Sequence, residues 1–296
     1  MNARGSGVRW LVTGARGQLG TELVDALAGR DVTATGRAEL DVLAPEDALR
    51  TWARGAAGRP LVVLNAAAWT DVDGAEADPA GAAAANALGP ARLATACAEL
   101  DATLVHVSTD YVFPGTASRP YEVDDAVGPL GVYGATKEAG ERAVRAAAGK
   151  HYIVRTAWLY GGGRNFVTTI SGLRHQRDTL DVVDDQRGCP TWSHPLAAGL
   201  VALAGSGARY GTYHCVGAGE ASWFELARAV FAELGEDPER VHPCNSSRFP
   251  RPATRPAYSV LSGRSWAAAG LRPLPHWRDQ LRSAIRANRS AFKRAH

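Results

Sequence analysis

The chain has 296 residues, of which 46% are hydrophobic and 21% are charged, and these values exclude a disordered or fibrous protein. Its 33 basic and 30 acidic residues leave a net charge of +3, which does not indicate a dedicated nucleic-acid-binding protein. No apolar run approaches the ~20 residues that a membrane-spanning helix needs. We therefore expect a cytoplasmic protein without a membrane or nucleic-acid partner, whose four cysteines, Cys97, Cys189, Cys215 and Cys244, are free thiols.

Segments typical of strands and helices alternate through the first two thirds of the chain. The predicted strands are 8–13, 31–35, 61–65, 103–108, 151–156 and 179–183. The predicted helices are 18–28, 80–100, 136–148 and 165–176. Because the strands are almost continuously apolar, this order predicts an α/β fold with a doubly wound parallel sheet that is covered by helices on both faces.

The last hundred residues show a different pattern. Helices are expected over 195–204 and 222–234, and a basic amphipathic helix over 277–296. The segment 238–256 contains five prolines and little periodicity, so we expect it to be a loop.

A glycine-rich turn follows the first predicted strand and opens the first helix. Its sequence is Gly14-Ala15-Arg16-Gly17-Gln18-Leu19-Gly20. Glycines permit the tight turn and let a pyrophosphate approach the backbone amides at the helix N-terminus. The turn therefore predicts a dinucleotide site of the Rossmann type that includes Gly14, Arg16, Gly17, Gln18 and Leu19.

The residues after the second strand indicate which dinucleotide binds. An acidic residue there would bind the adenosine ribose 2′-hydroxyl of NADH. The chain instead continues Thr35-Gly36-Arg37, with no carboxylate before Glu39. Arg37 could pair with a 2′-phosphate, so NADPH is the expected cofactor and NADH the alternative.

A tyrosine and a lysine four residues apart, Tyr133 and Lys137, follow in the same α/β unit. On a helix this spacing puts both side chains on one face. The ammonium group is expected to lower the pKa of the phenol and to bind a ribose hydroxyl. The phenol would then donate a proton to a carbonyl oxygen during hydride transfer. Lys137 is one of only three lysines in a chain with 30 arginines.

A polar cluster, Ser108-Thr109-Asp110-Tyr111, ends the fourth predicted strand. In open parallel sheets, ligands bind beyond the C-terminal ends of the strands. A hydroxyl at this position can donate a hydrogen bond to the carbonyl oxygen that Tyr133 protonates.

Together these motifs resemble the extended short-chain dehydrogenase/reductases, and more closely the dTDP-4-dehydrorhamnose reductase family. The similarity covers nearly the whole chain and includes the segments 65–68, 108–113, 155–161, 165–167, 185–191, 211–214 and 255–256. The resemblance implies NADPH-dependent or NADH-dependent reduction of the C4 ketone of a dTDP-4-keto-6-deoxyhexose. Residues 1–160 would then form the NAD(P)-binding Rossmann domain, with its sheet continued by parts of 161–220, and residues 161–296 would mainly bind the substrate.

The resemblance also implies roles for particular residues. The catalytic set would be Thr109, Tyr133 and Lys137. The cofactor would further contact Asp41, Val42, Asn65, Ala66, Ala67, Ala68 and Asn86. The sugar nucleotide would contact Asp110, Tyr111, Trp158 and Arg255.

The chain departs from the family pattern at Val123, where relatives often carry Glu. Some relatives form magnesium-bridged dimers, and Glu22 could match one of the bridging acids, but no further ligand can be assigned. We therefore assign no metal ligands, leave a magnesium-bridged dimer open, and expect either a monomer or a homodimer. The departure and the Arg/Ala-rich composition are compatible with a deoxysugar pathway of secondary metabolism, in which the ketosugar could differ from the rhamnose precursor.

Three alternative functions remain. In related 4,6-dehydratases the residue after Thr-Asp is Glu, and here it is Tyr111, which argues against dehydration. A nucleotide-sugar epimerase would retain its bound cofactor through purification. A non-catalytic, reductase-like regulatory subunit would not need the intact set of Thr109, Tyr133 and Lys137.

Overall fold

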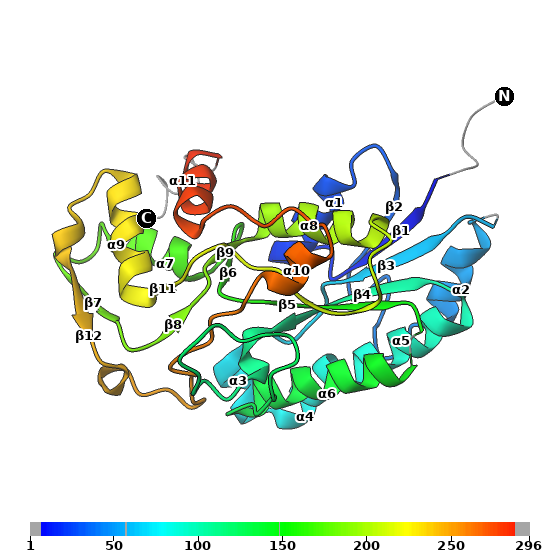
Figure 1. Cartoon of the computed structure of the whole chain (residues 1–296), viewed down its shortest axis with the longest axis horizontal. Helices are drawn as coiled ribbons and strands as arrows, with labels where there is room; N and C mark the ends of the chain where they lie inside the picture. The colour runs from blue at the N-terminus through cyan, green and yellow to red at the C-terminus, as the bar shows by residue number, and fades with distance from the viewer. Residues whose placement is uncertain (1–6, 57, 148, 288–296) are drawn as a thin grey trace.

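Six parallel strands form the central sheet of the protein, which is described here by a computed structural model of residues 7–56, 58–147 and 149–287 (Figure 1). In spatial order the strands are β10 (Gly211–His214), β5 (His151–Thr156), β4 (Thr103–Thr109), β3 (Leu61–Asn65), β1 (Arg9–Thr13) and β2 (Asp31–Thr35). All five neighbouring pairs are parallel. The strand order reverses between β1 and β3, which defines the point where such sheets bind ligands.

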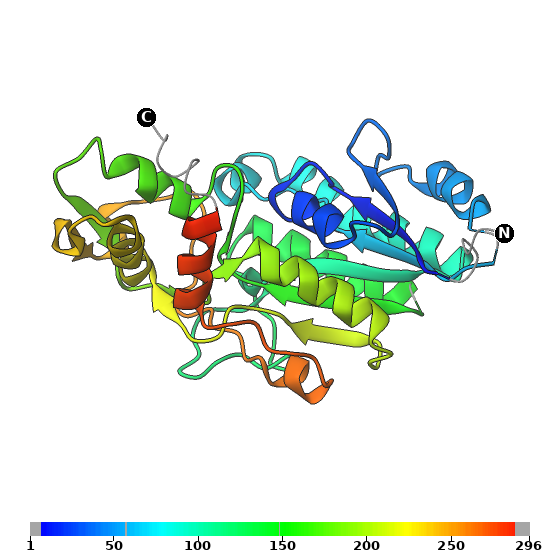
Figure 2. The same ribbon diagram turned by 90° about the horizontal axis from the view of Figure 1, so that it is seen from above.

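Helices cover both faces of this sheet, as the two views in Figures 1 and 2 show. One face carries α1 (Gln18–Ala26) and α8 (Ser193–Gly205), and the other carries α2 (Glu46–Arg54), α5 (Gly89–Glu99) and α6 (Val132–Ala147). The strand residues are apolar on both faces because each face packs against helices: β3 is buried along its whole length. The predicted doubly wound α/β fold is therefore confirmed.

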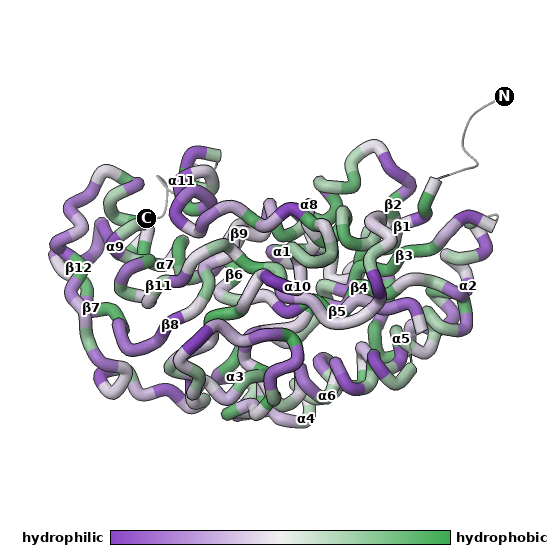
Figure 3. The backbone as a smooth tube through the Cα atoms, in the orientation of Figure 1, coloured by the Kyte–Doolittle hydropathy of each residue, from purple (hydrophilic) through white to green (hydrophobic). Residues whose placement is uncertain are grey.

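A smaller region follows the sheet and has its own hydrophobic core. Figure 3 shows hydrophobic and hydrophilic positions interspersed along the backbone of this region, around the label α9. It contains α7 (Phe166–Leu173), α9 (Trp223–Leu234) and α11 (Trp277–Ala287), with the paired strands β7 (Leu180–Val183) and β12 (Val241–Cys244). Both α7 and α9 begin with a capping box, at Asn165 and Ser222 respectively, so their N-termini are fixed locally.

Shorter elements connect these layers. They are α3 (Val72–Ala77), α4 (Pro79–Ala83), the π-helix η1 (Ala84–Leu88), η2 (Asp110–Val112), β6 (Leu159–Tyr160), β8 (Arg187–Gly188), β9 (Thr191–Trp192), β11 (Ala221–Ser222), η3 (Pro238–Arg240), η4 (Ser246–Arg248) and α10 (Arg264–Ala268). Strand β6 pairs with β9, and β8 pairs with β11.

Several sequence-based boundaries were wrong. The strand at 180–183 does not join the central sheet but pairs with β12, which lies in the segment 238–256 that was expected to be only loop. The sixth place in the sheet belongs to β10, whose Gly211 and polar residues hid its strand character. Helix α6 begins at Val132 and not at residue 136, so Tyr133 lies in its first turn. Helix α11 is described to Ala287, and its expected continuation to residue 296 lies outside the described residues.

No helix in the described ranges combines the length and the apolar character that crossing a membrane would require.

Candidate active site

A cavity of about 490 Å³ opens at the C-terminal ends of the sheet strands, between the sheet and the smaller region. The predicted site residues that line it are Gly17, Gln18, Leu19, Ala66, Ala68, Thr109, Asp110, Tyr111, Tyr133, Lys137 and Trp158. The wall opposite the sheet is formed by Asn165, Phe166 and Trp223. The structure therefore brings together the glycine turn, the Ser-Thr-Asp cluster and the Tyr/Lys pair, which are far apart in the sequence.

The glycine turn fits a dinucleotide by its shape and its free helix end. Gly14 has a φ of 65°, and a Cβ atom there would lie 2.7 Å from the backbone nitrogen of Ala67, so only glycine permits this close approach. Helix α1 begins at Gln18 without a capping side chain and without an acidic residue in its first turn. These features leave backbone amides and a positive helix end available to a pyrophosphate.

The end of β2 differs from the sequence-based expectation. The guanidinium group of Arg16, from the glycine turn, pairs with the carboxylate of Glu39, and the other Glu39 oxygen accepts a hydrogen bond from the backbone nitrogen of Gly36 at 2.8 Å. This hydrogen bond from Gly36 and the pairing with Arg16 lower the pKa of Glu39. Arg37 follows Gly36 in the sequence and is exposed. The end of β2, where the adenosine ribose is expected, therefore has Arg37 beside Gly36 in the chain and the pair of Arg16 with Glu39 next to it.

The other cofactor residues mostly shape the backbone next to the cavity. The Oδ1 atom of Asn65 accepts hydrogen bonds from the hydroxyl of Thr13 at 2.7 Å and from the backbone nitrogen of Ala67 at 3.1 Å, which fixes the loop containing Ala66 to Ala68. Asn86 is buried and forms two hydrogen bonds with the backbone of Trp69. Asp41 accepts a hydrogen bond from Leu43 within its own turn. The side chain of Val42 packs directly on Gly89, because a Cβ atom added at Gly89 would lie only 2.8 Å from it.

Tyr133 lies against two members of the polar cluster. Its ring meets that of Tyr111 edge to face, with 5.7 Å between the ring centroids. Burial raises the pKa of Tyr133 to about 12, and a hydrogen bond with Thr109 opposes that rise. The expectation that Lys137 lowers the pKa of this phenol is therefore wrong for this structure, because desolvation dominates. The phenol keeps its proton at neutral pH, as a proton donor must.

Lys137 is almost fully buried one helical turn after Tyr133. Its ammonium group donates a hydrogen bond to the carbonyl oxygen of Val107 at 2.6 Å. Burial lowers the pKa of Lys137 to about 8, and the charge of Glu141 opposes that shift. The charged amine is thus held at the cavity wall by β4.

Asp110 is a buried carboxyl group that faces the cavity. It accepts a hydrogen bond from the hydroxyl of Thr109 at 3.0 Å. Burial raises the pKa of Asp110 to about 6. A cavity with a hydroxyl, a carboxyl and a phenol in contact can bind and protonate the oxygen of a carbonyl substrate.

Trp158 adopts a backbone conformation that is unusual for a residue with a side chain. Its φ is 45°, and its ring stacks on Trp223 with 3.5 Å between centroids and 3° between planes. Strained backbone of this kind is concentrated at functional sites. One face of the indole is covered by Trp223, which the sequence did not indicate as a cavity residue.

Arg255 does not line the cavity itself. Its guanidinium group forms two hydrogen bonds with the carboxylate of Asp73, at 2.5 and 2.9 Å. Sequence reasoning missed Asp73, since nothing in the local pattern indicates an arginine partner 182 residues away.

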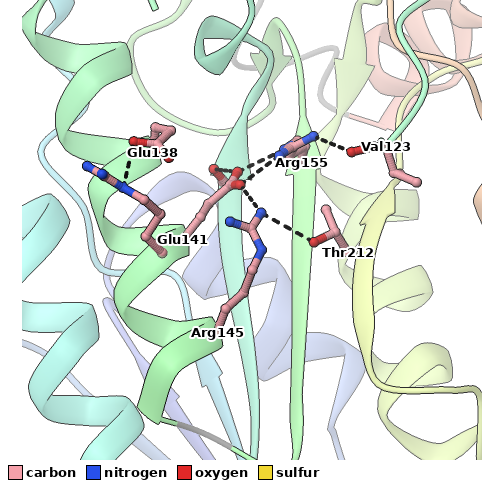
Figure 4. A network of polar contacts seen from close by, with 8 residues as sticks. Val123, Glu138, Glu141, Arg145, Arg155 and Thr212 are labelled. Carbon is pink, nitrogen blue, oxygen red and sulfur yellow. Dashed lines mark hydrogen bonds and ion pairs between the residues drawn. The ribbon is translucent and has the colours of Figure 1, made fainter. Parts of the chain in front are cut away.

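A buried ion-pair network between α6 and the sheet was also missed (Figure 4). The carboxylate of Glu141, which is 0% exposed, accepts hydrogen bonds from Ser108 at 2.6 Å, from Arg155 at 2.9 and 2.7 Å, and from Arg145 at 2.6 Å. Arg155 also donates to the carbonyl oxygen of Val123 at 3.1 Å. Removing one member of such a network typically costs about 3–5 kcal/mol. The network joins α6 to β4 and β5, and so fixes the helix that carries Tyr133 and Lys137.

The acidic residue considered for a magnesium bridge has a different partner. Glu22 lies 2.9 Å from the imidazole of His194. Within the described ranges, no group of three or more His, Cys, Asp or Glu side chains could hold a metal ion.

A parallel α/β sheet with a glycine turn, and a Tyr-x-x-x-Lys pair beside a Ser-Thr-Asp cluster, define an NAD(P)H-dependent oxidoreductase of the extended short-chain dehydrogenase/reductase class. Comparison with known proteins gives the family. The model of the RmlD substrate binding domain matches residues 8–290, and the chain belongs to that family, the dTDP-4-dehydrorhamnose reductases.

Individual relatives are similar along almost their whole length. The dTDP-4-dehydrorhamnose reductase of Streptomyces griseus is 51% identical over 94% of this chain and 93% of its own. The dTDP-4-keto-6-deoxy-D-glucose reductase of Streptomyces niveus is 46% identical over 94% and 96%. A crystal structure of dTDP-4-dehydrorhamnose reductase from Bacillus anthracis in complex with NADP has a TM-score of 0.89 at 34% identity and covers 95% of this chain and 99% of that one.

Proposed function

We propose that the protein reduces the C4 ketone of a dTDP-4-keto-6-deoxyhexose with NADPH. Membership of the class and of the family supports a reductase activity, and relatives from Streptomyces are named for the reduction of dTDP-4-ketosugars. The single observation that best supports this function is the convergence of Thr109, Tyr133 and Lys137 on the cavity that also contains the glycine turn.

The chain's own residues account for the proton-transfer half of the reaction. Tyr133 donates its phenolic proton to the oxygen that forms at C4, and the high pKa of the phenol ensures that the proton is present at neutral pH. Thr109, in contact with Tyr133, holds the carbonyl oxygen in line. Lys137, fixed by Val107, offers its remaining N–H groups to a ribose hydroxyl. A dinucleotide held by the glycine turn and the start of α1 would supply the hydride for C4.

The dinucleotide would bind across the switch point between β1 and β3. The amides at the start of α1 would hold its pyrophosphate, and Ala66 to Ala68 would border the nicotinamide side. At the adenosine end, Arg16 and Arg37 can neutralise a 2′-phosphate, which supports NADPH. Glu39 opposes that phosphate and could bind a 2′-hydroxyl, so NADH is the expected second cofactor.

The two regions divide the binding task in this proposal. Residues 1–160, with the sheet continued by parts of 161–220, bind the dinucleotide, and 161–296 mainly bind the sugar nucleotide. Asp110 and Tyr111 contact the sugar, while Trp158 and Arg255 border the nucleotide. The relatives named for several ketosugars support a role in deoxysugar biosynthesis, including that of secondary metabolites.

A turnover panel tests this function. The purified protein is mixed with NADPH or NADH and each of several dTDP-4-keto-6-deoxysugars, and cofactor oxidation is followed at 340 nm with NMR of the product at C4. Reduction at C4 is expected. An inverted but unreduced sugar with retained cofactor would identify an epimerase, and no turnover together with tight binding to another protein would identify a regulatory subunit.

A further inference from the structure

Helix α3 lies between the two parts of the site that must act together. Its first residue, Val72, lines the cavity. The helix packs beside α6, near the end that carries Tyr133 (Figure 1). Helix α3 carries two acidic side chains, Asp73 and Glu76, and each of them binds a different segment of the site.

Asp73 binds the segment 251–255. Besides the two hydrogen bonds from Arg255, its Oδ1 atom accepts one from the backbone nitrogen of Ala253 at 3.2 Å. Arg251 adds a second positive group at 3.9 Å. The hydrogen bond from Arg255 lowers the pKa of Asp73 and so favours the charged carboxylate that this pairing needs.

Glu76 binds the start of the catalytic helix. Its Oε1 atom accepts a hydrogen bond from the backbone nitrogen of Val132 at 2.8 Å. The approach is so close that a Cβ atom on Gly131 would lie 2.5 Å from the same oxygen and 4.0 Å from the side chain of Ala253. The first turn of α6, Glu76 and the segment bound by Asp73 therefore meet at one point.

The point where Glu76, the first turn of α6 and the segment 251–255 meet is next to Tyr133. Tyr133 is the residue after Val132, and its ring contacts Tyr111. Burial raises the pKa of Tyr111, and the charge of Arg255 opposes that rise, so the guanidinium group lies within electrostatic range of the Tyr111 phenol. A displacement of either segment at α3 would thus move Arg255 relative to Tyr133.

We propose that Asp73 and Glu76 are positioning residues, through which α3 sets Arg255 against the sugar nucleotide and Tyr133 against the ketone. This inference rests on the proposed function and deepens it. Asp73 acts through Arg255 and governs substrate affinity. Glu76 acts through the first turn of α6 and governs the rate of proton transfer.

The test compares Asp73→Asn and Glu76→Gln with Asp78→Asn as the matched control. Asp78 caps the next helix by accepting a hydrogen bond from Gly81 and touches neither segment. Asp73→Asn is expected to raise both the KM for the ketosugar and the Kd for dTDP about tenfold, the loss typical of a charge-assisted hydrogen bond, with kcat nearly unchanged. Glu76→Gln is expected to lower kcat severalfold with an unchanged Kd for dTDP. Asp78→Asn should leave all three values unchanged.

Three further variants, Arg255→Lys, Arg255→Ala and a double variant, exclude a merely structural effect. Arg255→Lys keeps the charge but loses the paired hydrogen bonds, so it should reproduce Asp73→Asn. The double variant Asp73→Asn with Arg255→Ala should bind dTDP no more weakly than Arg255→Ala alone. Additive losses in the double variant, or an unchanged Kd for dTDP in Asp73→Asn, would overturn the role of Asp73. An unchanged kcat in Glu76→Gln would overturn that of Glu76.

Calorimetry with dTDP needs no turnover, so it separates this proposal from the proposed reaction. If the protein binds dTDP through Asp73 and Arg255 but reduces no ketosugar, the role proposed for Asp73 would stand and the reductase function would be refuted. Absence of dTDP binding to the unaltered protein would contradict the role given to Asp73.

Discussion

The ammonium group of Lys137 lies 2.6 Å from the carbonyl oxygen of Val107, two residues before Thr109 on the same strand. This hydrogen bond ties α6, which carries Tyr133 and Lys137, to the strand that carries the hydroxyl of Thr109. It also explains why Lys137 can be buried as a cation, since the strand carbonyl replaces one of its water partners.

The burial of Lys137 predicts a loss of activity at alkaline pH. Burial lowers its pKa from 10.5 to about 8, so the ammonium group becomes neutral as the pH rises through that value. The reductase rate should therefore fall above about pH 8, while Tyr133, with a pKa of about 12, is still protonated. Lys137→Arg keeps its charge and should move the alkaline limb to higher pH, at a lower maximal rate. The measurement is kcat/KM against pH for both proteins, and an identical limb in both would assign it to another group.

Removal of the phenolic hydroxyl of Tyr133 should lower the rate of the chemical step without weakening cofactor binding. Tyr133→Phe is expected to lower kcat by roughly 100-fold or more, the range that general acid catalysis supplies, with cofactor binding retained. Tyr152→Phe is the matched control, because Tyr152 does not line the cavity and its hydroxyl donates a hydrogen bond to the carbonyl oxygen of Ala208 at 2.7 Å, so its removal should leave kcat within about twofold. Near-normal kcat in Tyr133→Phe would refute its role as the acid.

The carboxylate at the end of β2 should set the choice between the two cofactors. Glu39→Gln removes a negative charge beside the expected 2′-phosphate and releases Arg16 from its pair, so NADPH should bind about three- to tenfold more tightly relative to NADH. Arg37→Ala and Arg16→Ala should each weaken NADPH far more than NADH. Fluorescence titration of both dinucleotides measures the four Kd ratios. Equal losses of NADPH and NADH in an arginine variant would remove that residue from phosphate binding.

The ionised carboxylate of Asp110 should make the folded protein less stable at neutral pH than a neutral side chain at this position would. Its pKa is about 6 in the folded protein against 3.8 unfolded, so the folded state binds the proton more tightly. The resulting penalty is absent below pH 3.8, grows between the two values and is complete above pH 6, where it is on the order of 3 kcal/mol. Asp110→Asn should therefore raise the Tm at pH 8 and give little change at pH 4, while weakening sugar binding. An equal Tm shift at both pH values would show that the carboxyl group does not titrate in this way.

The sheet and the cavity-lining motifs were predictable from the sequence because their signals are local. The apolar run 61–65 and the glycine turn each carry their own pattern, and the register of a parallel sheet then brings the strand ends together. The pairs Asp73 with Arg255 and Glu141 with Arg155 were not predictable, since each joins segments whose neighbourhood only the fold decides. The pKa of Tyr133 was misjudged for the same reason: spacing shows a nearby cation, but it does not show burial. The cytoplasmic location and the oligomeric state stay predictions.

The return of the chain to the sheet at α8 and β10 restricts how the molecule can move. After Thr156 the backbone enters the smaller region, comes back for residues 193–214, leaves again, returns to the sheet core at 266–274 and ends in α11 of the smaller region. The two regions are therefore connected by five covalent passages and not by a single hinge. Closure over a sugar nucleotide must be a small shear distributed over all of them, and a gene fragment ending at residue 160 would lack the edge strand and leave the apolar side of α1 bare to water.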